Sequence, residues 1–208
     1  MIPFAGPALN CFEPAQPELR ESDTIMPLSS SQPRQPIHTR TLTLAGFRRD
    51  DGLWDIEGVL TDVKAYDFNG RFRPHVPAGE PVHEIHVRLT VDDDLTIEAA
   101  EASTDYAPFP MCADITPVFA GLKGMSLASG FMREVRARYG GTQGCTHIVE
   151  LLGSLATTAF QTIYPLLQRE RSGGRPALID SCHAFAADGE VVATLWPDHS
   201  TRPAADKT

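Results

Sequence analysis

The chain has 208 residues, and its 18 basic and 27 acidic side chains give a formal net charge of −9. This length allows one or at most two ordinary domains, and a composition of 42% hydrophobic and 22% charged residues is typical of a folded globular protein. The acidic balance, with no local run of Lys and Arg, argues against nucleic acid as the main partner.

Cysteine usage and hydropathy bear on the compartment. The four cysteines are too widely spaced for a disulfide framework. Cys11 lies in a Pro-rich segment, and we expect no chemical role for it. No basic and apolar leader pattern opens the chain, and no apolar run is long enough to span a membrane. We therefore expect a cytoplasmic protein with free thiols and no membrane partner.

Both ends of the chain differ in composition from its middle. Residues 1–36 hold seven of the 17 prolines and show no hydrophobic period, which predicts a flexible arm. Residues 198–208 read as a disordered tail. The segment 37–197 remains as a single domain.

The first half of this domain has the pattern of an antiparallel meander. Strands are expected at His38 to Phe47 and Leu53 to Phe68, joined by a turn at Asp50-Asp51-Gly52. Two further strands are expected at Val82 to Val91, where apolar and polar residues alternate, and at Leu95 to Thr104.

The second half is predicted to be mainly helical. Short helices are expected at Ile115 to Gly124 and Ser129 to Arg138, followed by one long amphipathic helix that begins at Cys145. Residues 177–197 read as a closing β-hairpin with a type I′ turn at Asp188-Gly189. The expected fold is α+β, a meander sheet packed by C-terminal helices.

Several Cys and His side chains could carry chemistry. His83 shares the apolar face of its strand with Ile85 and Val87, so it is expected to point inward, as a core histidine or a ligand. Cys112 and Cys145 each precede or begin a helix, where the helix dipole favours a thiolate; the alternative is a small buried hydrophobe.

Two other positions are candidates for proton transfer. His147 lies about 200° around the helix from Cys145, so the two are poorly placed to bind one metal ion, and His147 suits the role of a general acid or base better. The alternative is that His147 only lies next to the helix cap and has no role in catalysis. In the pair Cys182-His183 each side chain faces a different side of the expected strand, and the pattern does not choose between them.

Several sequence blocks resemble a bacterial domain-of-unknown-function family, number 2889. They are RRDDGLWDIEGVLTD, PVHEIHVRLTVD, PFPMC, GGTQGCTHIVELL with ATTAFQT, and DSCHAF with DGEVV. The resemblance covers about residues 38–197. It groups His83, Cys112, Cys145 and His147 as one constellation.

A weaker resemblance is to IscU/NifU-type iron–sulfur scaffold proteins, over GEPVHEIHVRLTVDDDLTIEAAEASTDYAPFPMC and the GlyLeuLysGly stretch after it. It implies an IscU-like core in which His83, Cys112 and Cys145 stand at the three ligand-cysteine positions. Ile85 falls at the aspartate position of the scaffold and cannot ligate, although Glu84 is adjacent. Iron–sulfur clusters favour thiolates, so one His and two Cys suit a mononuclear zinc ion, or alternatively iron.

These observations predict a metal-dependent enzyme, of lyase or hydrolase type, acting on a small organic and plausibly aromatic substrate. His83, Cys112 and Cys145 would bind the metal, while His147, Glu84 or His183 would carry protons. Two alternatives stay open: a non-catalytic metal or sulfur carrier, and a metal-free thiol enzyme that uses Cys145 and His147. A homo-oligomer is compatible with all three.

Overall fold

A computed structural model of the chain describes residues 28–167 and 174–203. Most of the predicted arm, residues 1–27, and the last five residues of the predicted tail lie outside these ranges. Residues 28–35 form no helix or strand, and the described residues from Pro36 onward belong to one compact unit. No helix of the described ranges is both long and apolar enough to cross a membrane.

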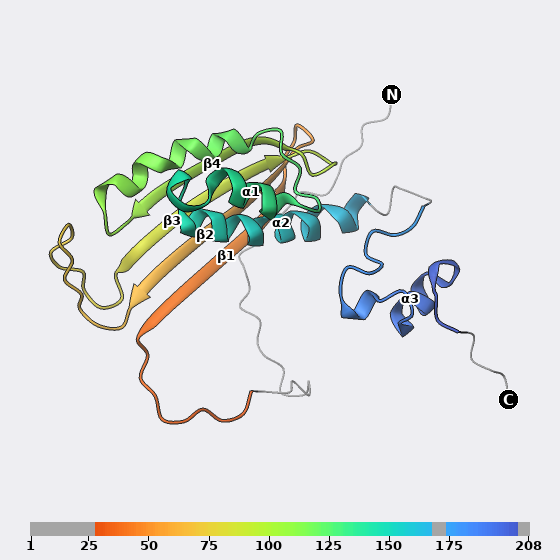
Figure 1. Cartoon of the computed structure of the whole chain (residues 1–208), viewed down its shortest axis with the longest axis horizontal. Helices are drawn as coiled ribbons and strands as arrows, with labels where there is room; N and C mark the ends of the chain where they lie inside the picture. The colour runs from red at the N-terminus through yellow and green to blue at the C-terminus, as the bar shows by residue number, and fades with distance from the viewer. Residues whose placement is uncertain (1–27, 168–173, 204–208) are drawn as a thin grey trace, which may run out of the picture. The chain divides into compact units, whose positions relative to one another are not determined.

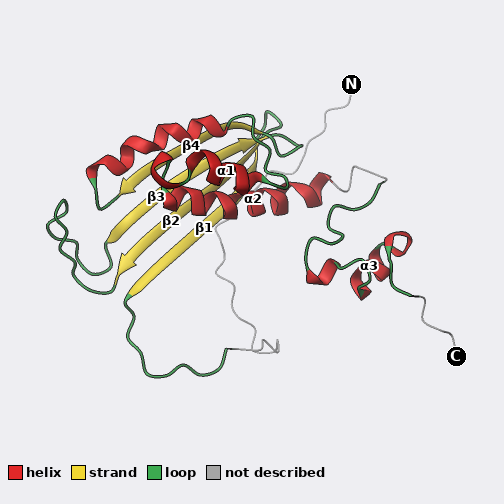
Figure 2. Cartoon of the chain, in the orientation of Figure 1, coloured by secondary structure: helices red, strands yellow, loops and turns green. Residues whose placement is uncertain are grey.

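The sheet has four strands in sequence order. They are β1 (His38–Arg48), β2 (Trp54–Lys64), β3 (Pro81–Val91) and β4 (Ile97–Tyr106), and each pairs antiparallel with the next (Figures 1 and 2). The antiparallel meander expected from the alternating sequence is confirmed.

One face of the sheet carries the core. On β2 the side chains of Trp54, Ile56 and Leu60 are buried, and on β3 those of Ile85, Val87, Leu89 and Val91. The alternate positions form a polar face, where Arg88 of β3 pairs with Glu57 of β2. This two-sided pattern follows from the period of two along a strand.

The covering layer comes from the second half of the domain. It consists of η1 (Pro110–Leu122), a 3₁₀-helical segment beside β4, then α1 (Phe131–Tyr139), the short turn η2 (Gly141–Gln143) and α2 (Thr146–Leu167) (Figure 1). Helix α2 packs on β1, β2 and β3, and α1 packs on α2. The side chains that α2 buries are Ile148, Leu151, Leu152, Leu155, Ala159 and Ile163.

A glycine in β2 lets α2 approach the sheet closely. A Cβ atom at Gly58 would lie 3.0 Å from Leu155 Cδ2 and 3.1 Å from Leu151 Cδ1. The two leucines therefore occupy the space that a side chain would fill. This contact anchors the helix over the centre of β2.

The closing hairpin predicted for residues 177–197 is wrong. The segment instead forms η3 (His183–Phe185), α3 (Glu190–Leu195) and η4 (Pro197–His199). A type I′ turn needs positive φ at both central residues, but Gly189 has φ −79° and precedes the first residue of α3. The carboxylate of Asp180 accepts a hydrogen bond from the backbone N–H of Ala187, at 2.9 Å, and this local bond closes a compact turn where the first strand was expected.

Candidate metal and thiol site

The candidate site lies at one end of the sheet, on the face covered by α2. Because the strands are antiparallel, the start of β1, the end of β2 and the start of β3 are neighbours there. Arg40 is opposite Asp62, and Asp62 is opposite His83, so the three side chains form a row across the strands. The first turn of α2 brings His147 to the same end.

Asp62 is the centre of this row. Its side chain is only 2% exposed. Arg40 binds both carboxylate oxygens, with Nε donating to Oδ1 and Nη2 to Oδ2, each at 2.8 Å. His38 Nε2 lies 3.0 Å from Oδ1. Burial by itself would raise the pKa of Asp62, but the bonds from Arg40 and the nearby His38 and His83 lower it to about 2.

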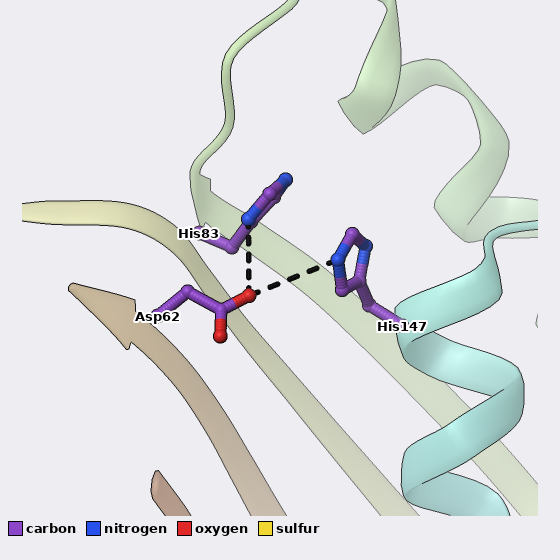
Figure 3. A group of neighbouring side chains, drawn as sticks. All are labelled: Asp62, His83 and His147. Atoms are coloured by element: carbon purple, nitrogen blue, oxygen red, sulfur yellow. Dashed lines mark ion pairs between the residues drawn. The ribbon is translucent and has the colours of Figure 1, made fainter. Parts of the chain in front are cut away.

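Two imidazoles face the second oxygen of this carboxylate (Figure 3). Asp62 Oδ2 lies 3.1 Å from His83 Nδ1 and 3.8 Å from His147 Nε2. The two rings have centroids 4.1 Å apart and are tilted by 36°. All three donor atoms lie within 4.8 Å of one another, a spacing that one metal ion could bridge.

His83 has the properties of an uncharged ligand. Burial, and then the proximity of His147, lower the pKa of its ring, although Asp62 opposes the shift. The lowered pKa favours the uncharged ring, which has a lone pair available for a ligand. Although Nδ1 is within ion-pair distance of Asp62, it is buried without a hydrogen-bond partner among the described residues. A buried nitrogen left in this state is costly unless something else binds it.

Cys145 lies on the far side of His147. Its Sγ is 3.8 Å from His147 Nδ1, so the imidazole has the thiol on one nitrogen and Asp62 on the other. Burial would raise the pKa of this thiol. Bonding to His147 and the backbone N–H groups of Ile148 and His147 outweighs that effect, so the pKa is lowered. These donors at the start of α2 favour the thiolate.

The low pKa of Asp62 predicts an acid-sensitive contribution to stability. Because folding lowers this pKa from 3.8 to about 2, the contribution is complete above about pH 4 and is lost as the pH falls toward 2. We expect a loss of about 2 kcal/mol in unfolding free energy over that window, measured by urea denaturation in EDTA so that no cation is bound. The variant Asp62→Asn should lack this step; an identical pH profile in both proteins would contradict the assignment.

The structure brings together only part of the predicted ligand set. His83 lies at the site. Cys145 contacts His147, which is part of the site, whereas Cys112 lies in η1. Among the described residues, two clusters have three ligand atoms within 4.8 Å of one another. The first is Asp62 with His83 and His147, and the second is Glu84 with His86 and Asp105. Neither contains a cysteine.

The residues predicted to carry protons are also separated. His147 is in the first cluster, but Glu84 alternates with His83 along β3 and belongs to the second cluster. His86 Nε2 lies 3.5 Å from Glu84 Oε1 there. His183 is exposed in η3, in the segment where the strand prediction failed.

Sequence reasoning missed Asp62, Arg40 and His38. A signal for Asp62 was present, because it continues the inward alternation of Trp54, Ile56 and Leu60. A carboxylate at an inward position needs partners, which is the same argument that selected His83. Arg40 could be recognised only once the register of β1 against β2 was known.

This arrangement defines an α+β protein with a partly buried Asp/His/His cluster and an adjoining thiol. The chain belongs to the family described as "Protein of unknown function (DUF2889)", whose model matches residues 38–161. The match includes all of the cluster together with Arg40 and Cys145, and it ends before His183. No curated protein and no solved structure matches the chain.

Proposed function

We propose that the protein is a metal-dependent enzyme of lyase or hydrolase type for a small organic substrate. Its metal, zinc or alternatively iron, would be bound by Asp62, His83 and His147. This set replaces the combination of His83 with Cys112 and Cys145. The observation that carries the proposal is the convergence of three ligand atoms within 4.8 Å, one of them the buried Nδ1 of His83 without a hydrogen-bond partner.

The donor set fits such an ion. Two imidazoles and one carboxylate are the protein ligands of several catalytic zinc sites, and the same combination holds non-haem Fe²⁺. Three protein ligands leave at least one position open for water or substrate. A metal bound there would polarise a substrate oxygen or acidify a bound water.

The surrounding side chains supply the support that ligands of this kind need. An imidazole that binds a metal through one nitrogen usually donates a hydrogen bond from the other. For His147 the acceptor would be Cys145 Sγ, 3.8 Å from Nδ1. Asp62 is held in turn by Arg40 and His38. With Cys145 beside it, Nδ1 of His147 is also where a proton could be held or passed on.

Metal analysis of the full chain tests this proposal. After purification without chelator, we expect about one equivalent of zinc or iron per chain by mass spectrometry. His83→Ala and His147→Ala should each lose it, because two remaining ligands bind weakly. His86→Ala is the matched control, since His86 is on the opposite face of β3 in the other cluster.

The outcomes separate the alternatives. If all proteins lack metal even after anaerobic purification, the metal-dependent reading fails. If only His86→Ala loses the metal, the ion belongs to the cluster with Glu84 and Asp105. A brown protein with visible charge-transfer bands would instead favour the iron–sulfur or metal carrier implied by the scaffold resemblance.

A metal-free thiol enzyme is the second candidate, and one observation favours it. Cys145 Sγ, His147 and Asp62 are connected in that order, with 3.8 Å between Sγ and Nδ1 and 3.8 Å between Nε2 and Oδ2. This is the order of nucleophile, base and orienting carboxylate in thiol enzymes. Selective alkylation of Cys145 at neutral pH in metal-free protein, slowed in His147→Ala, would support it. Equal rates of alkylation at Cys112, Cys145 and Cys182 would contradict it.

A further inference from the structure

Arg40 touches two elements that the proposed metal site depends on. Through Nε and Nη2 it binds both oxygens of Asp62, and through Nη1 it binds Glu150 Oε2 in the second turn of α2. It therefore links the carboxylate at the end of β2 to the helix that carries His147. A guanidinium can make these contacts together because its five N–H donors form a rigid planar fork.

The fork constrains Asp62 in a way that matters for a ligand. A carboxylate attached to a single side-chain bond can rotate, but two parallel bonds from Arg40 stop that rotation. Each oxygen has lone pairs remaining after the fork is satisfied. On Oδ1 these face His38, and on Oδ2 they face His83 and His147. Only Oδ2 is thus presented to the two imidazoles.

We propose that Arg40 is the positioning residue of the metal site, orienting Asp62 Oδ2 toward the ion and holding the start of α2, through Glu150, at the same end of the sheet. This inference rests on the proposed function. It assigns Arg40 no contact with metal or substrate. Its role is geometric, and a lysine, which keeps the charge but has no fork, cannot fill it.

The test measures zinc affinity of the full-length chain by competition with a chromogenic chelator. We expect Arg40→Lys to weaken zinc binding about 10- to 100-fold, the usual effect of losing a partner of a ligand. Glu150→Gln, which keeps the fork on Asp62, should weaken it only about two- to fivefold, as for a partly exposed ion pair. Arg88→Lys is the matched control, because Arg88 makes an ion pair with Glu57 on the polar face of the sheet. The zinc affinity of this variant should equal that of the wild type.

A readout independent of stability completes the experiment. Co²⁺ substituted for zinc reports ligand geometry through its visible spectrum, which should change in Arg40→Lys and stay unchanged in Arg88→Lys. Arg40→Lys protein that binds zinc within twofold of the wild type, with the same Co²⁺ spectrum, would overturn the inference and leave the proposed site intact. If Arg40→Lys does not fold, Glu150→Gln decides, and zinc affinity equal to that of the wild type counts against the link. A wild-type chain that binds neither ion would instead overturn the proposed function, and the inference with it.

Discussion

Replacing Asp62 by alanine is expected to destabilise the protein by about 2–3 kcal/mol, through the loss of its charged hydrogen bonds, and to abolish zinc binding. The side chain of Asp62 is 2% exposed, and its two oxygens accept the hydrogen bonds from Nε and Nη2 of Arg40. Removing it leaves Nε and Nη2 of Arg40 without an acceptor, although Glu150 still binds Nη1, and takes away the proposed ligand oxygen between His83 and His147. Urea unfolding and zinc titration measure the two effects separately.

A double substitution separates the structural role of Asp62 from its role as a ligand. In Asp62→Leu with Arg40→Met, the partly buried ion pair becomes an apolar contact, and such a replacement is often neutral or stabilising. We expect stability to return to within about 1 kcal/mol of the wild type, while zinc binding stays absent. Zinc binding by the double variant would show that Asp62 is not a ligand. Wild-type stability in Asp62→Ala would contradict the ion pair itself.

The second large effect is expected from Gly144→Ala, next to Cys145. A Cβ atom at this position would lie 2.3 Å from the backbone oxygen of Tyr139 and 3.2 Å from Phe119 Cζ. Because the closer atom belongs to the backbone, no side-chain rotation relieves the clash, and the turn before α2 must move. We expect a loss of about 1–3 kcal/mol in unfolding free energy, as for overpacked sites, together with weaker zinc binding as His147 shifts.

Gly153→Ala is the matched control within α2. The nearest atom to a Cβ at this position is Met132 Sδ at 3.6 Å, an ordinary contact. Alanine should therefore stabilise the helix by about 0.5–1 kcal/mol without changing zinc affinity. Urea unfolding of both variants gives the comparison. Equal stability in the two glycine variants would mean that the close approach at Gly144 is absent.

The sequence was informative about which face each residue occupies. Alternation along β3 correctly placed His83 with Ile85 and Val87, because a strand repeats every two residues whatever its neighbours are. The breaks at glycine and proline located the four strands and the helices α1 and α2 to within a few residues, whereas the helix expected from Ile115 begins at Pro110, as η1. Residues 177–197 were misread because apolar alternation over a short segment fits a strand and a short helix almost equally well.

The tertiary structure decided which residues meet. Alternation states that Asp62 and His83 each point inward, but only the register of β2 against β3 makes them opposite neighbours. The position of α2 then adds His147 and Cys145, whereas Cys112 lies in η1, outside the cluster. Length, composition and a charge of −9 identified a folded acidic domain, and the local pattern supplied candidate ligands. The grouping of those ligands depends on contacts between distant segments, which no local pattern encodes.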